Sequence, residues 1–239
     1  MKNDGCRGSV NTRRAVDIGE VRRLMAHATG DEKHDESTTS TLDALAVLYG
    51  RILRVDPKNP TWPERDRFIL SKGHGPAAYY AILAHLGFFP ESWLDDFMEW
   101  GGKLGSHPDR ALVPGVEAST GSLGHGLPMS VGVALALRSK GLTEQRVVVL
   151  AGDAELNEGS NWEAILLAPA LGLNTLTLLV IDNHSSHLSM VPFDAKLGSF
   201  GWRARVVDGH DHDALEAAFR ERDAERPTAV VADIPEGEW

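Results

Sequence analysis

Two short runs of almost uninterrupted apolar residues, 146–151 and 176–181, constrain the fold of this chain more than any other feature. Both are rich in Val, Ile and Leu, which is typical of central parallel strands that are covered on both faces. Each run ends in a polar pair, Gly152-Asp153 after the first and Asp182-Asn183 after the second. Ligands of open α/β sheets bind beyond the carboxyl ends of the strands, so these polar residues lie where a site is expected.

Helical and strand-like patterns alternate along the chain, which predicts an α/β fold with a mostly parallel central sheet and helices on both faces. Further strands are predicted at 203–207 and 229–232, and helices at 42–53, 77–86, 126–140, 160–169 and 212–223. Residues 126–140 are apolar almost all round, which predicts a buried helix. Capping boxes at Ser40 to Asp43 and at Ser160 to Glu163 are expected to begin two of the helices. The length of 239 residues suits one domain over 21–239 after an N-terminal tail over 1–20.

Composition excludes several classes of function. The formal net charge of -10 gives no electrostatic attraction to a phosphate backbone, so no nucleic-acid partner is expected. The single cysteine, Cys6, cannot form an internal disulfide, which favours a reducing, cytoplasmic location. The N-terminal stretch has no apolar run typical of a signal peptide, and Pro169 and Asn174 interrupt the most apolar segment, so no membrane association is expected.

Two constellations carry candidate chemistry. The Asp153 carboxylate and the Asn183 amide, at the ends of the two apolar runs, offer the hard oxygen ligands that suit Mg²⁺ or Ca²⁺. The glycine-rich segment 120–126 precedes the predicted helix, where free N–H groups and a close backbone approach suit an anion. Taken singly, the first also fits a pair of loop residues that cap helices, and the second also fits an ordinary glycine-rich turn.

Three histidines lie in loops marked by glycine or proline: His34, His74 and His107. Histidine exchanges protons near neutral pH and forms hydrogen bonds with sugar hydroxyls. A single histidine in a loop is more often structural, and it is the shared context of the three that favours a catalytic role.

Several segments in order resemble the transketolase family. Residues 152–164, followed by Ile181-Asp182-Asn183, resemble its thiamine diphosphate signature, and 66–75, 119–124 and 207–211 are similar to further motifs of the family. The resemblance runs from about residue 22 to about residue 233 and implies the thiamine-diphosphate-binding fold. It implies thiamine diphosphate and Mg²⁺ as cofactors, with Ca²⁺ or Mn²⁺ as substitutes for Mg²⁺.

The resemblance also implies roles for individual residues. Asp153 and Asn183 would hold the metal with the Ser185 carbonyl, and His34, His74 and His107 would line the substrate channel. Leu123 would pack near the thiazolium ring, and Glu158 would lie at a dimer interface. The full set implied to contact the cofactor is Gly121, Ser122, Leu123, Gly152, Asp153, Ala154, Glu158, Asn183 and His187.

In that family the diphosphate-binding and pyrimidine-binding domains usually share one chain, whereas this sequence covers only the first. It is therefore similar to the N-terminal subunits of split transketolases, which implies a C-terminal, pyrimidine-binding partner, self-association and an α2β2 heterotetramer. The implied activity is transfer of a two-carbon ketol unit from a ketose donor, in a specialised or secondary-metabolic pathway. Two alternatives stay open: transfer of an acyl or glycolyl unit from a 2-oxo donor to a carrier protein, and a non-catalytic interaction subunit.

The sequence departs from the family pattern at three places. Ala154 replaces the usual glycine of the signature, which would be strained only at a positive φ. Asp35, Glu36 and Ser37 follow His34 in place of the usual Pro-Gly-Gly. Residues 232–239 lack the family's lysine- and glycine-rich segment with its further histidine, so one channel contact is expected to be missing or to come from the partner.

Overall fold

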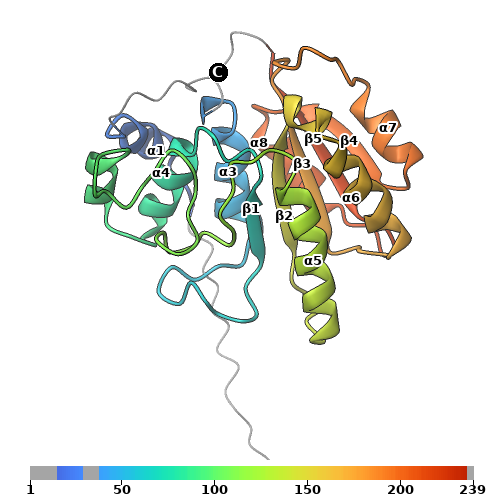
Figure 1. Ribbon diagram of the computed structural model, residues 1–239, viewed down its shortest axis with the longest axis horizontal. Coiled ribbons are helices and arrows are strands. Elements are labelled where there is room, and N and C mark those ends of the chain that lie inside the picture. Colours follow the sequence, from blue (N-terminus) through green and yellow to red (C-terminus); the bar gives the residue numbers. More distant parts are fainter. Residues whose placement is uncertain (1–14, 29–37, 236–239) are drawn as a thin grey trace, which may run out of the picture.

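The structure is a computed structural model that describes residues 15–28 and 38–235, and its centre is one parallel sheet (Figure 1). The strand order is β1-β2-β3-β5-β4, and every neighbouring pair is parallel. The strands are β1 (Arg67–Leu70), β2 (Val147–Gly152), β3 (Leu176–Asp182), β4 (Arg203–Asp208) and β5 (Thr228–Asp233). The predicted parallel sheet is confirmed, and of its strands the sequence patterns missed only the four-residue β1. They also missed the helices at Ile18–Met25 and Phe193–Ser199.

Helices cover both faces of the sheet (Figure 1). One core cluster joins the sheet to α1 (Ile18–Met25), α3 (Leu42–Val47), α4 (Ala77–Leu86) and α8 (His212–Arg220). The other joins it to α5 (Gly126–Ser139), α6 (Gly159–Ala170) and α7 (Phe193–Ser199). The remaining elements are a π-helical turn at Leu48–Ile52 and 3₁₀ turns at Glu91–Asp96 and Ala154–Asn157.

Alternate residues of the strands supply the two cores, as the pleat requires. Val148 and Leu150 of β2 lie in the first cluster, whereas Val147 and Val149 lie in the second. Because the strands are parallel, the polar residues that follow β1, β2 and β3 all lie at the carboxyl ends of the strands, which we call the polar edge of the sheet. No helix in the described ranges has the length and apolar content needed to cross a bilayer.

Both predicted capping boxes are wrong in detail, because tertiary partners take the capping side chains. Helix α3 begins after Thr41, which makes no side-chain cap bond, and Asp43 instead accepts from His210 Nδ1 at 2.9 Å and His212 Nε2 at 2.8 Å. Helix α6 begins at Gly159, and the Ser160 hydroxyl donates to the Gly124 carbonyl at 2.7 Å. The box residue is therefore used to hold the glycine-rich loop.

The prediction of a fully buried helix over 126–140 is also wrong. Helix α5 packs against β2 and α6, but Met129, Gly132 and Ala136 on its outer side are exposed. One side of this apolar helix packs on the sheet. The other side is also apolar, and within the described residues nothing covers it.

Asp66 lies at the other end of the strands, directly before β1 begins. Its carboxylate is 1% exposed and accepts from the backbone N–H groups of Arg54 and Arg146, both at 2.8 Å, and from the Arg54 guanidinium at 3.1 Å. Since these bonds tie the residues that precede β1 and β2, they hold the two strands in register.

We predict that Asp66→Ala lowers the free energy of unfolding by about 2–4 kcal/mol, because it leaves buried N–H donors without an acceptor. Urea denaturation measures the change. The control is Asp56→Ala, which removes a carboxylate that accepts from the Lys58 N–H in a surface turn. A loss below about 0.5 kcal/mol, the range of surface substitutions, would contradict this role.

Candidate functional site

The ends of β2 and β3 meet at the polar edge of the sheet. Gly152 pairs with Ile181 in the last register position, and the Asp153 N–H donates to the Ile181 carbonyl at 2.9 Å. Asp153 is 2% exposed and Asn183 is 5% exposed. Two residues thirty positions apart are thus held at neighbouring strand ends, as the sequence predicted.

The Asp153 carboxylate faces the turn that follows β3. Its Oδ1 accepts from the Ser185 hydroxyl at 2.9 Å, and its Oδ2 accepts from the Ser186 N–H at 3.0 Å. The buried Asn183 Oδ1 has no hydrogen-bond partner within the described residues. The amide oxygens of Gln145 and Asn161 are also buried without a partner among the described residues, and Asn183 Oδ1 is the one that follows β3 directly. Such a group is open to a ligand such as an ion. The Asp153 and Asn183 oxygens therefore fit the donor set that Mg²⁺ takes from proteins.

Two loops close against the glycine-rich segment. Gly121 has a φ of 141°, and a Cβ built on it would lie 2.3 Å from Cδ2 of His107. A Cβ on Gly73 would lie 2.7 Å from the Gly121 nitrogen. The structure therefore brings His107, and the turn that carries His74, against the glycine loop. His107 Nδ1 lies 3.0 Å from the Ser106 hydroxyl, which leaves Nε2 for a ligand.

The backbone N–H groups of this edge divide into two sets. Those of Gly124 and Gly152 donate to the buried Glu155 carboxylate. Those of Gly121 and Ala154 donate to no protein acceptor in the described part of the chain. Ala154 carries no backbone strain, because positive φ outside glycine occurs only at Met98 and His184 among the described residues.

Two buried charges near Asp153 were missed by the sequence reasoning. Lys72 is 5% exposed, its stem would lie 3.2 Å from a Cβ on Gly152, and its Nζ lies 3.3 Å from the Ser40 hydroxyl. Burial lowers the pKa of Lys72 to about 8, against the opposing attraction of Asp153 and Glu155. Burial also raises the pKa of Glu155, although its hydrogen bonds to Ser71, Gly124 and Gly152 and the charge of Lys72 favour the ionised form. Both residues stand inside the recognised motifs, but nothing in the sequence alone shows that they are buried.

A hydrogen bond between His184 and Asp233 braces the turn after β3. His184 adopts a φ of 55°, and its Nε2 lies 2.8 Å from Oδ1 of Asp233 on β5. This hydrogen bond raises the pKa of His184, and burial raises the pKa of the neighbouring Asp182. Ligand atoms of Asp182, His184 and Asp233 lie within 4.8 Å of one another, so the imidazole occupies the space between the two carboxylates.

The other predicted site residues occupy varied positions. Gly152 is buried at the end of β2, and Leu123 is half-buried in the loop. Ser122, Glu158 and His187 are exposed at the same edge. His34 lies outside the described residues.

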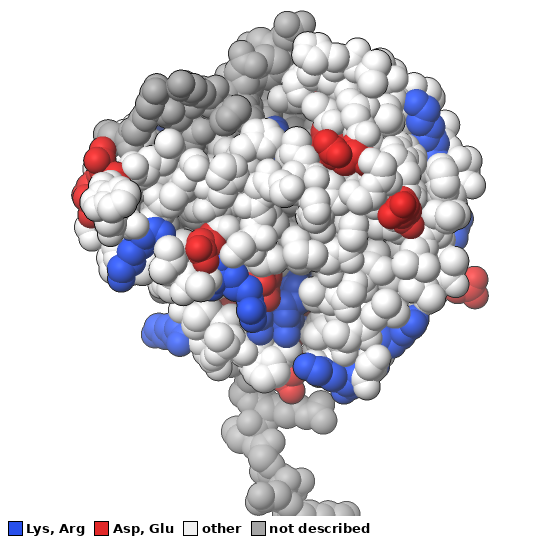
Figure 2. All heavy atoms as spheres, in the orientation of Figure 1, with Lys and Arg blue, Asp and Glu red and all other residues white. Residues whose placement is uncertain are grey.

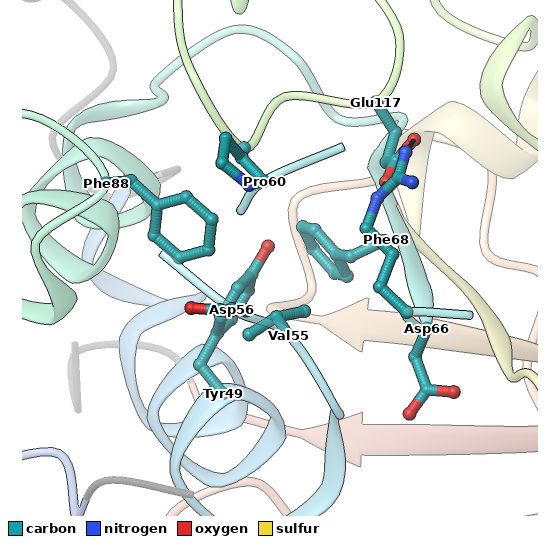
Figure 3. Close-up of a pocket in the computed structure, with 10 residues that line it drawn as sticks. Tyr49, Val55, Asp56, Pro60, Asp66, Phe68, Phe88 and Glu117 are labelled. Carbon is teal, nitrogen blue, oxygen red and sulfur yellow. Dashed lines mark hydrogen bonds and ion pairs between the residues drawn. The ribbon is translucent and has the colours of Figure 1, made fainter. Parts of the chain in front are cut away.

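A small cavity of about 10 Å³, room for a single water, lies away from this edge (Figure 3). It adjoins the beginning of β1 and is lined by Tyr49, Val55, Asp56, Pro60, Arg65, Asp66, Phe68, Phe88, Gly115 and Glu117. Arg65 and Glu117 form an ion pair of 2.6 Å in its wall. Because β1 runs from this cavity toward Ser71, the cavity is separate from the candidate site.

Comparison with known proteins shows the family to which the chain belongs. Residues 9–234 match the family described as "Transketolase, thiamine diphosphate binding domain". The chain belongs to the transketolase family. A transketolase mutant from Pichia stipitis superimposes with a TM-score of 0.77 at 28% identity, over 90% of this chain and 35% of that chain. The transketolase fold predicted from the sequence is therefore confirmed, and this chain spans about a third of that solved transketolase.

Two relatives match over most of their own length. A protein of Actinobacillus succinogenes, named as one subunit of an apulose-4-phosphate transketolase, is 38% identical over 85% of this chain and 76% of its own. A Rhodococcoides fascians protein named "Ferredoxin fas2" is 45% identical over 90% of this chain and 71% of its own. Clusters of the ferredoxin type need four thiolates, and this sequence has one cysteine, so the match with the second relative does not carry that chemistry to this chain.

We predict that Lys72→Met raises the free energy of unfolding of the cofactor-free chain by about 2–3 kcal/mol at pH 7. The folded pKa of about 8 lies below the ordinary 10.5, so the unfolded chain holds this proton more tightly. The wild type therefore gains stability as the pH rises through this interval, and the advantage of Met shrinks toward pH 10.5. Urea unfolding at pH 7 and pH 10 measures it, with exposed Lys58→Met as the control. A difference independent of pH would contradict the assignment.

Proposed function

We propose that this chain is the diphosphate- and Mg²⁺-binding subunit of a two-component transketolase. The enzyme transfers a two-carbon ketol unit from a ketose donor by means of thiamine diphosphate, in a specialised pathway of the cytoplasm. The observation that carries the proposal is the buried pair at the ends of the neighbouring strands β2 and β3, an Asp153 carboxylate and an Asn183 amide oxygen that lacks a donor. Because the chain belongs to the transketolase family, whose matching domain binds thiamine diphosphate, we interpret this pair as the metal ligands of that cofactor.

The residues present fit the cofactor. Asp153 and Asn183 would hold Mg²⁺ together with the Ser185 carbonyl, and the Gly121 and Ala154 N–H groups would bind diphosphate oxygens. The absence of a Cβ at Gly121 allows a ligand or His107 to approach the backbone closely. Metal and N–H groups together offset the negative charge that a diphosphate would bring to an acidic protein.

Thiamine diphosphate, when bound, supplies the electron sink that allows a carbon–carbon bond of the donor to break. The chain contributes orientation and proton handling. His107, anchored through Nδ1 near Ser106, would hold or release a proton at Nε2 toward a donor hydroxyl. His74 would act from the adjoining turn, and His34 is proposed for the same channel. Ser122, Leu123 and His187 would enclose the cofactor.

An uncharged outer face supports a partner chain. Met129 is 37% exposed on α5, and Leu166 and Leu167 are 61% and 46% exposed on α6. Figure 2 shows few charged side chains over this region of the molecule. Large apolar side chains exposed on a face with few charges are typical of contacts between subunits. Because one relative is named as a subunit, we assign self-association and a pyrimidine-binding partner to this chain, with Glu158 near the contact, in an α2β2 assembly.

Asp153→Ala is expected to abolish retention of Mg²⁺ and thiamine diphosphate by the assembled enzyme. The cofactor-free chain still folds, with a lowered unfolding temperature because the Ser186 N–H loses its acceptor. The substitution removes a ligand at a strand end and little packing. Calorimetric titration measures the affinity, with Asp208→Ala at the end of β4 as the control. Wild-type affinity in the Asp153 variant would contradict the metal assignment.

Leu166→Glu is expected to weaken the association of the two components at least about tenfold, because a charge would be buried in an apolar contact. Analytical ultracentrifugation with the partner chain measures the change, and Val206→Glu on the β4 edge, 45% exposed in the wild type, is the control. A monodisperse monomer that ignores the partner would contradict the two-component enzyme.

The direct test of activity combines the two purified components with a ketose donor, an aldose acceptor, Mg²⁺ and thiamine diphosphate. Ketol transfer that requires all of these is the expected result. A two-carbon adduct on a carrier protein, detected by mass spectrometry, would instead establish the acyl-transfer alternative. Absence of cofactor uptake by the assembled complex would establish a non-catalytic subunit.

A further inference from the structure

A buried carboxylate joins three segments that are far apart in the sequence. Glu155 is 1% exposed, and its Oε1 accepts from the Ser71 hydroxyl at 2.5 Å and from the Gly124 N–H at 3.0 Å. Its Oε2 accepts from the Gly152 N–H at 3.3 Å. Ser71 follows β1, Gly124 lies in the glycine-rich loop and Gly152 ends β2. One side chain therefore connects three segments that surround the candidate site.

The network continues into helix α5. The Ser71 hydroxyl, which donates to Glu155, accepts from the Gly126 N–H at 3.0 Å. A Cβ on Gly126 would lie 2.3 Å from the Ser71 side chain, so the close approach requires glycine. The Ser71 hydroxyl therefore connects Glu155 to Gly126, the first residue of the helix, through two hydrogen bonds.

The carboxylate also decides which N–H groups stay available. Gly124 and Gly152 are committed to Glu155, whereas Gly121 and Ala154 have no acceptor within the described residues. An anion already bound to part of a glycine loop fixes the loop and restricts where a second anion binds.

We infer that Glu155 is a positioning residue for the cofactor: it fixes the glycine-rich loop to the end of β2 and reserves the Gly121 and Ala154 N–H groups for the diphosphate. This inference rests on the proposed function. A purely structural role would alter unfolding and the local N–H groups without altering anion affinity.

The test compares Glu155→Gln with wild type and with the exposed control Glu144→Gln. Glutamine keeps an oxygen for Ser71 and Gly124 but turns its NH₂ group toward the Gly152 N–H. Hydrogen exchange at Gly152, followed by NMR on the cofactor-free full chain, is expected to accelerate at least about tenfold. The dissociation constant for Mg²⁺ with inorganic pyrophosphate is expected to rise about 10- to 100-fold, and neither quantity changes in the control.

A second variant, Ser71→Ala, decides the question if Glu155→Gln does not fold. It is expected to accelerate exchange at Gly126 and to weaken pyrophosphate binding about 3- to 10-fold. Unchanged exchange in these variants overturns the network. Faster exchange with unchanged affinity overturns the positioning role and leaves the proposed function standing. A wild-type chain that binds no Mg²⁺ with pyrophosphate overturns the proposed function, and the inference with it.

Discussion

The hydrogen bond from the Asp153 N–H to the Ile181 carbonyl, 2.9 Å long, is the contact on which the candidate site depends. It extends the parallel pairing of β2 and β3 by one position beyond Gly152 and brings the Asp153 carboxylate to the turn that carries Asn183 and Ser185. A shift of one residue would turn the carboxylate to the opposite face of the sheet. Fully buried apolar side chains along both strands prevent that shift.

Charge is the second constraint on this edge. Asp153 and Glu155 are nearly inaccessible to water, and burying a charge is costly unless it is paired or hydrogen-bonded. Each carboxylate accepts from backbone N–H and serine hydroxyl donors, and Lys72 adds a buried positive charge between the glycine loop and α3. His184 serves the outer carboxylates in the same way through Asp233. The arrangement is held in place before any ligand arrives.

The sequence patterns predicted the sheet and the convergence of positions 153 and 183, because parallel strands of apolar residues bring their carboxyl ends together. They missed β1, whose four residues are too few to show a pattern between charged neighbours. They misread both capping boxes, because Asp43 and Ser160 bond to partners distant in the chain. Burial of Lys72 and Glu155 is a tertiary property with no local signal. The roles assigned to the site residues, the three channel histidines included, stay predictions.

The central claim is that one cation bridges residues 153 and 183 and carries a diphosphate. Anomalous diffraction at the manganese edge, from crystals of the assembled enzyme grown with Mn²⁺ and thiamine diphosphate, tests it most directly. The account predicts a single strong peak in this chain, about 2.0–2.3 Å from an Asp153 carboxylate oxygen and from Asn183 Oδ1. A peak elsewhere, or an Asn183 oxygen that still lacks a partner when the diphosphate is bound, would contradict it.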